Sequence, residues 1–239
     1  MRPVVQEKNL NSEKEHRNRA IGALALLAPV PSLGVVAAMI MAPGPVGHTL
    51  FMAAKIWLLV FPAAWYLVVE RGRPSWSPPR SGGLLLGLLS GLAIAALIGI
   101  GAWLAGVGAM DLAPLRQAVG EMGLGASTTY LFAAAGWTLV NSLIEEYVYR
   151  WFILRQTVRL FSATGAIIAS AAIFTVHHII AVSQYLNPVY SLLASLGVFI
   201  GGLIWAWLYH RYRSIWPGWI SHILADVAVF GIGWWLLFG

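Results

Sequence analysis

Two adjacent carboxylates at the end of a long apolar run are the groups of this chain best placed to do chemistry. Glu145 and Glu146 close that run, and Arg150 follows Glu146 by four residues, which is one helical turn. Asn141, Glu145 and Tyr149 form a second stripe with the same spacing. A charge at membrane depth costs about 2.5 to 3.5 kcal/mol on insertion scales. Two neighbouring carboxylates at low dielectric cannot both ionise cheaply, so one of them can take up a proton near neutral pH.

Two later apolar segments carry further ionisable groups. His178 lies in one of them, and His222 and Asp226 lie four residues apart in the next. A carboxylate at that spacing can fix the tautomer and orientation of an imidazole. Ionisable residues within spans usually face the bundle interior or a water-filled cavity and pair there. We therefore expect the three segments to contribute to one functional site.

Each group also has an ordinary structural interpretation. Glu146 and Arg150 can form an ion pair that holds helices together, and His178 can be a hydrogen-bonded core histidine. His177 is more simply explained as a packed or lipid-facing histidine. Under the structural interpretation, three separate segments would each carry the insertion cost of buried polar groups without any chemistry that needs them. The functional interpretation is therefore favoured.

Several familiar catalytic patterns are absent from the sequence. It contains neither the HExxH pattern of zinc proteases nor a GxSxG elbow. Ser221 precedes His222, but neighbours on a helix point about 100° apart and do not form a Ser–His pair. The absence of cysteine excludes disulfides, iron–sulfur clusters, thiolate zinc sites and cysteine nucleophiles.

The composition is that of an integral membrane protein. Of the 239 residues, 59% are hydrophobic and only 10% are charged, where a soluble domain has about 25%. The net charge of +6 does not indicate a nucleic-acid partner, because the cations lie mainly beside apolar segments. We predict an all-α, polytopic transmembrane helix bundle. Its seven expected spans are Ala20–Ala42, His48–Val69, Gly82–Ala109, Ser127–Ile144 continuing as helix to about Val158, Thr164–Tyr185, Val189–His210 and Ile215–Phe238.

The distribution of basic residues predicts the topology. Five Lys and Arg lie in the tail 1–19, three in the loop 70–81, and two after each of the fourth and sixth spans. The intervening loops carry one at most. This alternation predicts a cytoplasmic N-terminus and an external C-terminus. Lys55, inside the second span, is expected to snorkel or to contact a neighbouring helix.

We expect three parts in the chain. Residues 1–19 form a polar cytoplasmic tail, residues 20–126 form N-terminal transmembrane helices, and residues 127–239 form a catalytic transmembrane core. The Pro-rich loop Arg71–Arg80 cannot be helical throughout. A short amphipathic helix is expected at about Ala113–Met122.

Three motifs together resemble those of a known family. EEYVYR (Glu145–Arg150), FTVHH (Phe174–His178) and HILAD (His222–Asp226) are similar to the EExxxR, FxxxH and HxxxN or HxxxD motifs of the intramembrane endopeptidases that process CAAX proteins and bacteriocins, the CPBP or Abi family. The motifs occur in the family's order, and the resemblance covers about residues 127–239. Asp226 stands where the best-known prenyl-protein proteases have Asn. The resemblance therefore leaves open whether the substrate is prenylated.

The resemblance implies a peptidase in which six residues form the site. Glu145 would take a proton from water, and His178 would hold and polarise that water. His222 would donate to the developing oxyanion and be oriented by Asp226. Arg150 would hold Glu146 and the catalytic helix, although the sequence leaves open which of Glu145 and Glu146 is the base.

No cofactor is expected, but the sequence leaves open whether the site binds zinc. Glu145, His178 and His222 are the candidate ligands, since two histidines and one glutamate can bind zinc with an open fourth position. The expected substrate is a membrane-anchored or lipidated protein or peptide, and the expected location is a bacterial or archaeal plasma membrane. The alternatives are a non-proteolytic family member that acts as a scaffold, immunity factor or regulator, and a transporter or proton relay.

Overall fold

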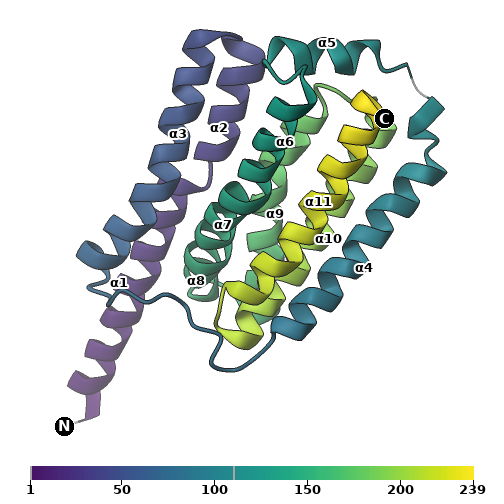
Figure 1. The fold of residues 1–239 in the computed structure, drawn as a ribbon. Helices are drawn as coiled ribbons and strands as arrows, with labels where there is room; N and C mark the ends of the chain where they lie inside the picture. Colours follow the sequence, from purple (N-terminus) through teal and green to yellow (C-terminus); the bar gives the residue numbers. More distant parts are fainter. Residues whose placement is uncertain (1, 110) are drawn as a thin grey trace. The chain divides into compact units, whose positions relative to one another are not determined.

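The computed structural model describes residues 2–109 and 111–239, and these residues contain helices and connecting segments but no strand (Figure 1). The elements are α1 (Arg2–Leu27), α2 (Val30–Val36), η1 (Ala37–Met41), α3 (Pro45–Ala64), η2 (Trp65–Val69), α4 (Leu84–Leu104), η3 (Val107–Ala109), α5 (Ala113–Glu121), α6 (Ser127–Gly136), η4 (Trp137–Asn141), α7 (Ser142–Glu145), η5 (Glu146–Ile153), α8 (Leu154–Val158), α9 (Ala163–Val182), α10 (Pro188–Tyr212) and α11 (Trp216–Phe238).

Most of the expected spans are long apolar helices. Six helical stretches among the described residues are long and apolar enough to cross a membrane: Ser12–Met41, Pro45–Val69, Leu84–Leu104, Ala163–Val182, Pro188–Tyr212 and Trp216–Phe238. The chain is therefore a multi-pass, all-α integral membrane protein. The expected amphipathic helix is α5, and the Pro-rich loop 71–80 is irregular, as expected.

The fourth expected span is helical from residue 127 to residue 158, but it alternates between α-helix and π-helix. In η4 the N–H of Ser142 bonds to the carbonyl of Trp137, five residues back, and a longer π-helical stretch, η5, begins at Glu146. The single α-helical turn α7 lies between the two and ends at Glu145. π-Helical turns are rare and occur frequently at functional sites. Both glutamates therefore lie where this helix changes its pitch.

The chain divides into two compact units. The first contains residues 1–76 and 148–206, and the second contains residues 77–147 and 207–239. This division follows packing, whereas the division expected from the sequence follows function and stays a prediction.

In the first unit, the end of η2 is bound to α8 by charged groups. The carboxylate of Glu70 accepts hydrogen bonds from Arg155 at 3.0 Å, from Gln156 at 2.8 Å and from Arg159 at 2.8 Å. The Glu70 side chain is only 7% exposed. Its pairing with two guanidinium groups offsets part of the cost of burying it. Elsewhere in this unit α2 packs against α3 and α9, and α8 packs against α1 and α9.

In the second unit, α11 lies closely along α4. A Cβ added at Gly87 would lie 2.3 Å from the carbonyl oxygen of Pro217, and one added at Gly91 would lie 2.8 Å from the Cα of Ser221. The hydroxyl of Ser90 also donates to the hydroxyl of Ser221 at 3.1 Å. Small residues on α4 thus allow the close approach of the helix that carries His222.

The segment 127–145 also contacts α11. Tyr130 donates from its hydroxyl to the carbonyl of Phe230 at 3.0 Å, and the indole of Trp219 donates to the carbonyl of Leu139 at 3.2 Å. The same indole lies 3.1 Å from the hydroxyl of Ser142. These contacts fix α11 against the segment that ends in Glu145.

Candidate active site

His222 lies among three carboxylates of the second unit. Its Nδ1 is 3.2 Å from Oε1 of Glu146, a hydrogen-bonding distance. Its Nε2 is 3.7 Å from Oε2 of Glu145 and 3.8 Å from Oδ1 of Asp226. His222 is 4% exposed, Glu145 8% and Glu146 0%. The structure therefore brings four of the six expected site residues together in one cluster, in which Asp226 alone is partly exposed.

His222 has a hydrogen-bonding carboxylate in addition to the expected neighbour Asp226. Asp226 was expected to orient the imidazole, but the carboxylate at hydrogen-bonding distance belongs to Glu146 and contacts Nδ1. An ionised carboxylate only accepts, so the N–H of Nδ1 donates to it. Glu146 thus contacts one nitrogen of the ring and Asp226 lies toward the other, and the expected orienting role of Asp226 stays a prediction.

Glu145 is held in place by its own helix. The amide of Asn141 donates to Oε1 of Glu145 at 2.9 Å, as the four-residue stripe of the sequence indicates. The distance of 3.7 Å from Oε2 to Nε2 of His222 is too long for a direct hydrogen bond. Glu145 thus presents a proton acceptor close to an imidazole.

In the first unit, the backbone of α9 fixes the tautomer of His178. Its Nδ1 is 3.0 Å from the carbonyl oxygen of Phe174, one turn earlier. A carbonyl only accepts, so Nδ1 carries the proton and donates it. In the neutral ring the lone pair is then on Nε2, which is the atom that can accept from water or bind a metal.

The neighbouring His177 is also held by a specific polar contact, which the sequence did not indicate. Its Nδ1 is 3.2 Å from the hydroxyl of Tyr149, and the two rings are nearly parallel at 10°. Ser170 donates to the carbonyl of Tyr149 at 3.0 Å, and the ring of Phe174 meets that of Tyr149 edge to face. Residues 170, 174 and 177 share one face of α9, and this face docks on Tyr149.

Arg150 is fully buried in the first unit among aromatic rings. Its guanidinium carbon lies 4.5 Å from the ring centre of Phe174, 5.4 Å from that of Trp205 and 5.8 Å from that of Tyr149. A cation over an aromatic face is stabilised by about 2 kcal/mol or more when it is desolvated. Arg150 thus ties its helix to α9 and α10, and its expected pairing with Glu146 stays a prediction.

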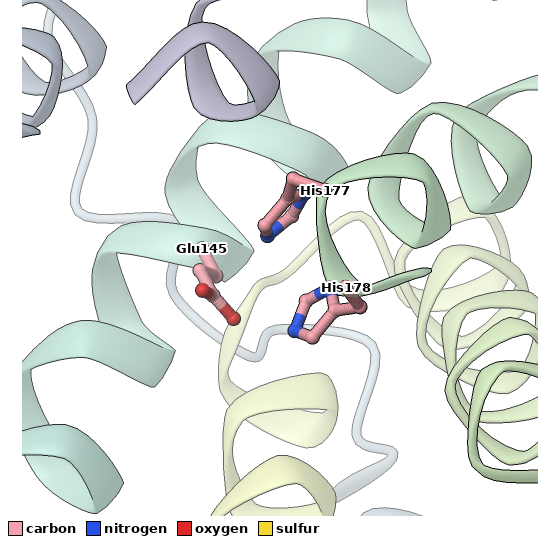
Figure 2. A group of neighbouring side chains, drawn as sticks. All are labelled: Glu145, His177 and His178. Atoms are coloured by element: carbon pink, nitrogen blue, oxygen red, sulfur yellow. The ribbon is translucent and has the colours of Figure 1, made fainter. Parts of the chain in front are cut away.

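Figure 2 shows Glu145 on its helical segment and the two histidines, His177 and His178, on α9. Glutamate and histidine are ligand types that zinc accepts, and His178 has its lone pair on the nitrogen that would bind. By donor chemistry the chain thus has suitable zinc ligands, among them Glu145 and His178.

The fold and these contacts define a multi-pass membrane protein with a buried glutamate–histidine cluster. Residues 127–228 match the family model described as Rce1-like, type II CAAX prenyl endopeptidase Rce1-like. The match confirms the resemblance to the CPBP family that the three motifs indicated, and it covers somewhat less than half of the chain. No curated protein and no solved structure matches the chain. The matched segment contains all six expected site residues, Glu145, Glu146, Arg150, His178, His222 and Asp226.

Proposed function

We propose that this chain is an intramembrane endopeptidase that hydrolyses a peptide bond of a membrane-anchored or lipidated protein or peptide. The observation that carries the proposal is the position of His222 among Glu145, Glu146 and Asp226. This cluster lies within the segment that matches an endopeptidase family. A buried acid–base cluster in a membrane protein is costly and is retained mainly for function.

Glu145 is the general base of the proposed mechanism. Its carboxylate removes a proton from a water molecule, while the water oxygen attacks the carbonyl carbon of the substrate. The protonated Glu145 then gives the proton to the amide nitrogen as the carbon–nitrogen bond breaks. The hydrogen bond from Asn141 holds the carboxylate in place during both transfers.

His222 stabilises the oxyanion in this mechanism. Its Nδ1–H donates to Glu146, so Nε2 can donate to an oxyanion only when the ring carries both protons. The surrounding carboxylates favour this imidazolium form by charge complementarity. Glu146 and Asp226 are positioning residues, because they act on the substrate through His222.

His178 accepts from the attacking water in the same mechanism. Its Nε2 lone pair suits this role, because Nδ1 is committed to the carbonyl of Phe174. Arg150 acts on the helix that follows the two glutamates, since its buried guanidinium packs against α9 and α10. A zinc ion, if one is bound, would act as a Lewis acid and would be held by Glu145, His178 and His222.

The test is peptide cleavage by purified protein in lipid vesicles, with a library of membrane-anchored peptides as substrates. We expect cleavage by the wild type and none by Glu145→Gln, because Gln keeps the shape but takes no proton. Cleavage should also survive exhaustive chelation. Activity that is lost on chelation and restored by zinc would overturn the glutamate mechanism. A wild type that cleaves no peptide in the library would contradict the proposed function.

A further inference from the structure

We propose that the first unit carries a binding surface for the headgroups of anionic phospholipids, formed by five arginines around Glu70. This surface does not depend on the proposed catalytic function. Its members come from three separate parts of the chain: Arg19 of α1, Arg71 and Arg73 of the loop after η2, and Arg155 and Arg159 of the α8 end.

Three of these arginines contact the end of η2, and the other two follow it directly in the loop. Arg19 donates to the carbonyl of Val69 at 3.2 Å, and Arg155 and Arg159 both bind Glu70. The loop then turns sharply, since Arg71 has a left-handed backbone with φ of 52°. We call this group of five arginines the arginine cluster.

A second set of contacts holds the loop itself. The hydroxyl of Tyr66 donates to the carbonyl of Arg73 at 3.1 Å. The guanidinium of Arg155 lies over the same Tyr66 ring, 4.6 Å from its centre. Tyr66 thus joins the loop to the rest of the arginine cluster within one unit.

The charge balance of the arginine cluster is strongly positive. Among the described side chains, the carboxylates that contact it are Glu70 and Glu15, and Glu15 pairs with Arg19. Arg71 and Arg73 are exposed, and the ion pairs described for this cluster involve Arg19, Arg155 and Arg159. Five cations against these two anions leave an excess positive charge that favours the binding of an external anion.

The location and the residue type favour a phospholipid phosphate as that anion. The arginine cluster lies at the end of the apolar stretch Pro45–Val69, where a spanning helix reaches the headgroup region. The loop continues to Trp76, which is 90% exposed, and exposed tryptophans are typical of the membrane interface. All five cations are Arg, whose planar guanidinium binds phosphate through two parallel hydrogen bonds.

Lipid selectivity tests this proposal. The protein is reconstituted in phosphatidylcholine vesicles that contain a minor share of phosphatidylglycerol, and the lipids that stay bound after purification are quantified by mass spectrometry. We expect the wild type to enrich phosphatidylglycerol above its share in the vesicles. The variant Arg71→Asn with Arg73→Gln should lose about fivefold of this preference for each arginine removed.

The choice of variants distinguishes the loss of lipid binding at the arginine cluster from unfolding and from a general loss of positive charge. Asn tolerates the left-handed backbone of residue 71, and neither substituted arginine binds Glu70, so the fold should be kept. Arg116→Gln on α5 removes one charge elsewhere and should leave the enrichment unchanged. Unchanged enrichment in the double variant would overturn the proposal.

Two further outcomes would also overturn it. One is that inorganic phosphate alone raises the melting temperature as much as phosphatidylglycerol does, which would assign the arginine cluster to a free anion. The other is that the double variant weakens peptide binding while lipid selectivity is kept, which would assign it to substrate recognition.

Discussion

At the scale of single residues, the two adjacent glutamates make different contacts with His222. Glu146 accepts from Nδ1, whereas Oε2 of Glu145 lies 3.7 Å from Nε2. The sequence alone left open which glutamate is the base. It could not decide, because both glutamates lie in the same apolar segment, and only the position of α11 shows which contact each of them makes with His222.

The first prediction follows from this difference. Glu145→Gln should abolish peptide cleavage, while Glu146→Gln should leave measurable activity, because Gln still accepts from Nδ1 through its carbonyl oxygen. His222→Ala should lower kcat by roughly 100- to 1000-fold, the usual loss for one oxyanion donor. Single-turnover cleavage rates in vesicles measure all three. Abolished cleavage in Glu146→Gln with residual cleavage in Glu145→Gln would exchange the two roles.

The second prediction concerns Tyr149 and His177. Tyr149→Phe keeps the ring but removes the hydroxyl that contacts His177, so stability should fall by about 0.5 to 1.5 kcal/mol. If this contact also sets the position of α9 and therefore of His178, kcat should fall while KM changes little. Thermal unfolding and steady-state kinetics measure the two effects. The control is Val176→Ala, at an exposed position of α9 next to His177. It should change neither the stability nor kcat.

A purely packing role for Tyr149 gives a different result. Stability would then fall without any change in kcat at a temperature where the variant is folded. The sequence did not single out His177, because its partner Tyr149 lies 28 positions earlier and no local pattern connects them.

At the scale of helices, hydropathy predicted the long apolar spans but not the changes in helix pitch. Bilayer thickness sets the length of a span, so a window of apolar residues is sufficient to find it. In the short π-helical segments η4 and η5, backbone hydrogen bonds link residues five positions apart instead of four. Apolar periodicity cannot distinguish these two spacings within a single turn, so the pitch around Glu145 had to come from the structure.

The third prediction tests how α4 positions α11. Gly91→Ala would place its Cβ 2.8 Å from the Cα of Ser221, next to His222, and overpacking of this kind costs about 1 to 3 kcal/mol. We expect lower thermal stability and lower peptide cleavage. Gly99→Ala is the matched control on the same helix, where no atom lies within 4 Å of the added Cβ. It should be neutral or stabilising by up to about 1 kcal/mol.

Equal behaviour of the two alanine variants would show that the close approach of α4 to α11 does not matter for activity. Since α4 lies outside the segment that matches the family, a selective loss in Gly91→Ala would show that a helix beyond the shared segment supports His222.

At the scale of the whole molecule, the basic loops predict a cytoplasmic N-terminus and seven crossings. Six long apolar helices are present, and the helical segment 127–158 is the remaining candidate. The chain has no cysteine, so single cysteines can be introduced without background. We expect a cysteine at Gly44 to react with an impermeant reagent from outside intact cells and one at Ser75 to be protected. Labelling of the Gly44 position only from the cytoplasm would reverse the predicted orientation.

The buried cluster at Glu70 has a consequence for how the protein is made. Its partner Arg155 lies 85 residues later in the chain. At synthesis rates of about 5 to 20 residues per second, the ribosome needs roughly 4 to 17 seconds to extend the chain from one to the other. Throughout that interval the nascent chain has the carboxylate but neither Arg155 nor Arg159. We therefore expect the end of η2 to stay in water or at the ribosome–membrane junction during this interval. In a ribosome stalled before residue 155, Glu70 should be accessible to carboxyl-modifying reagents.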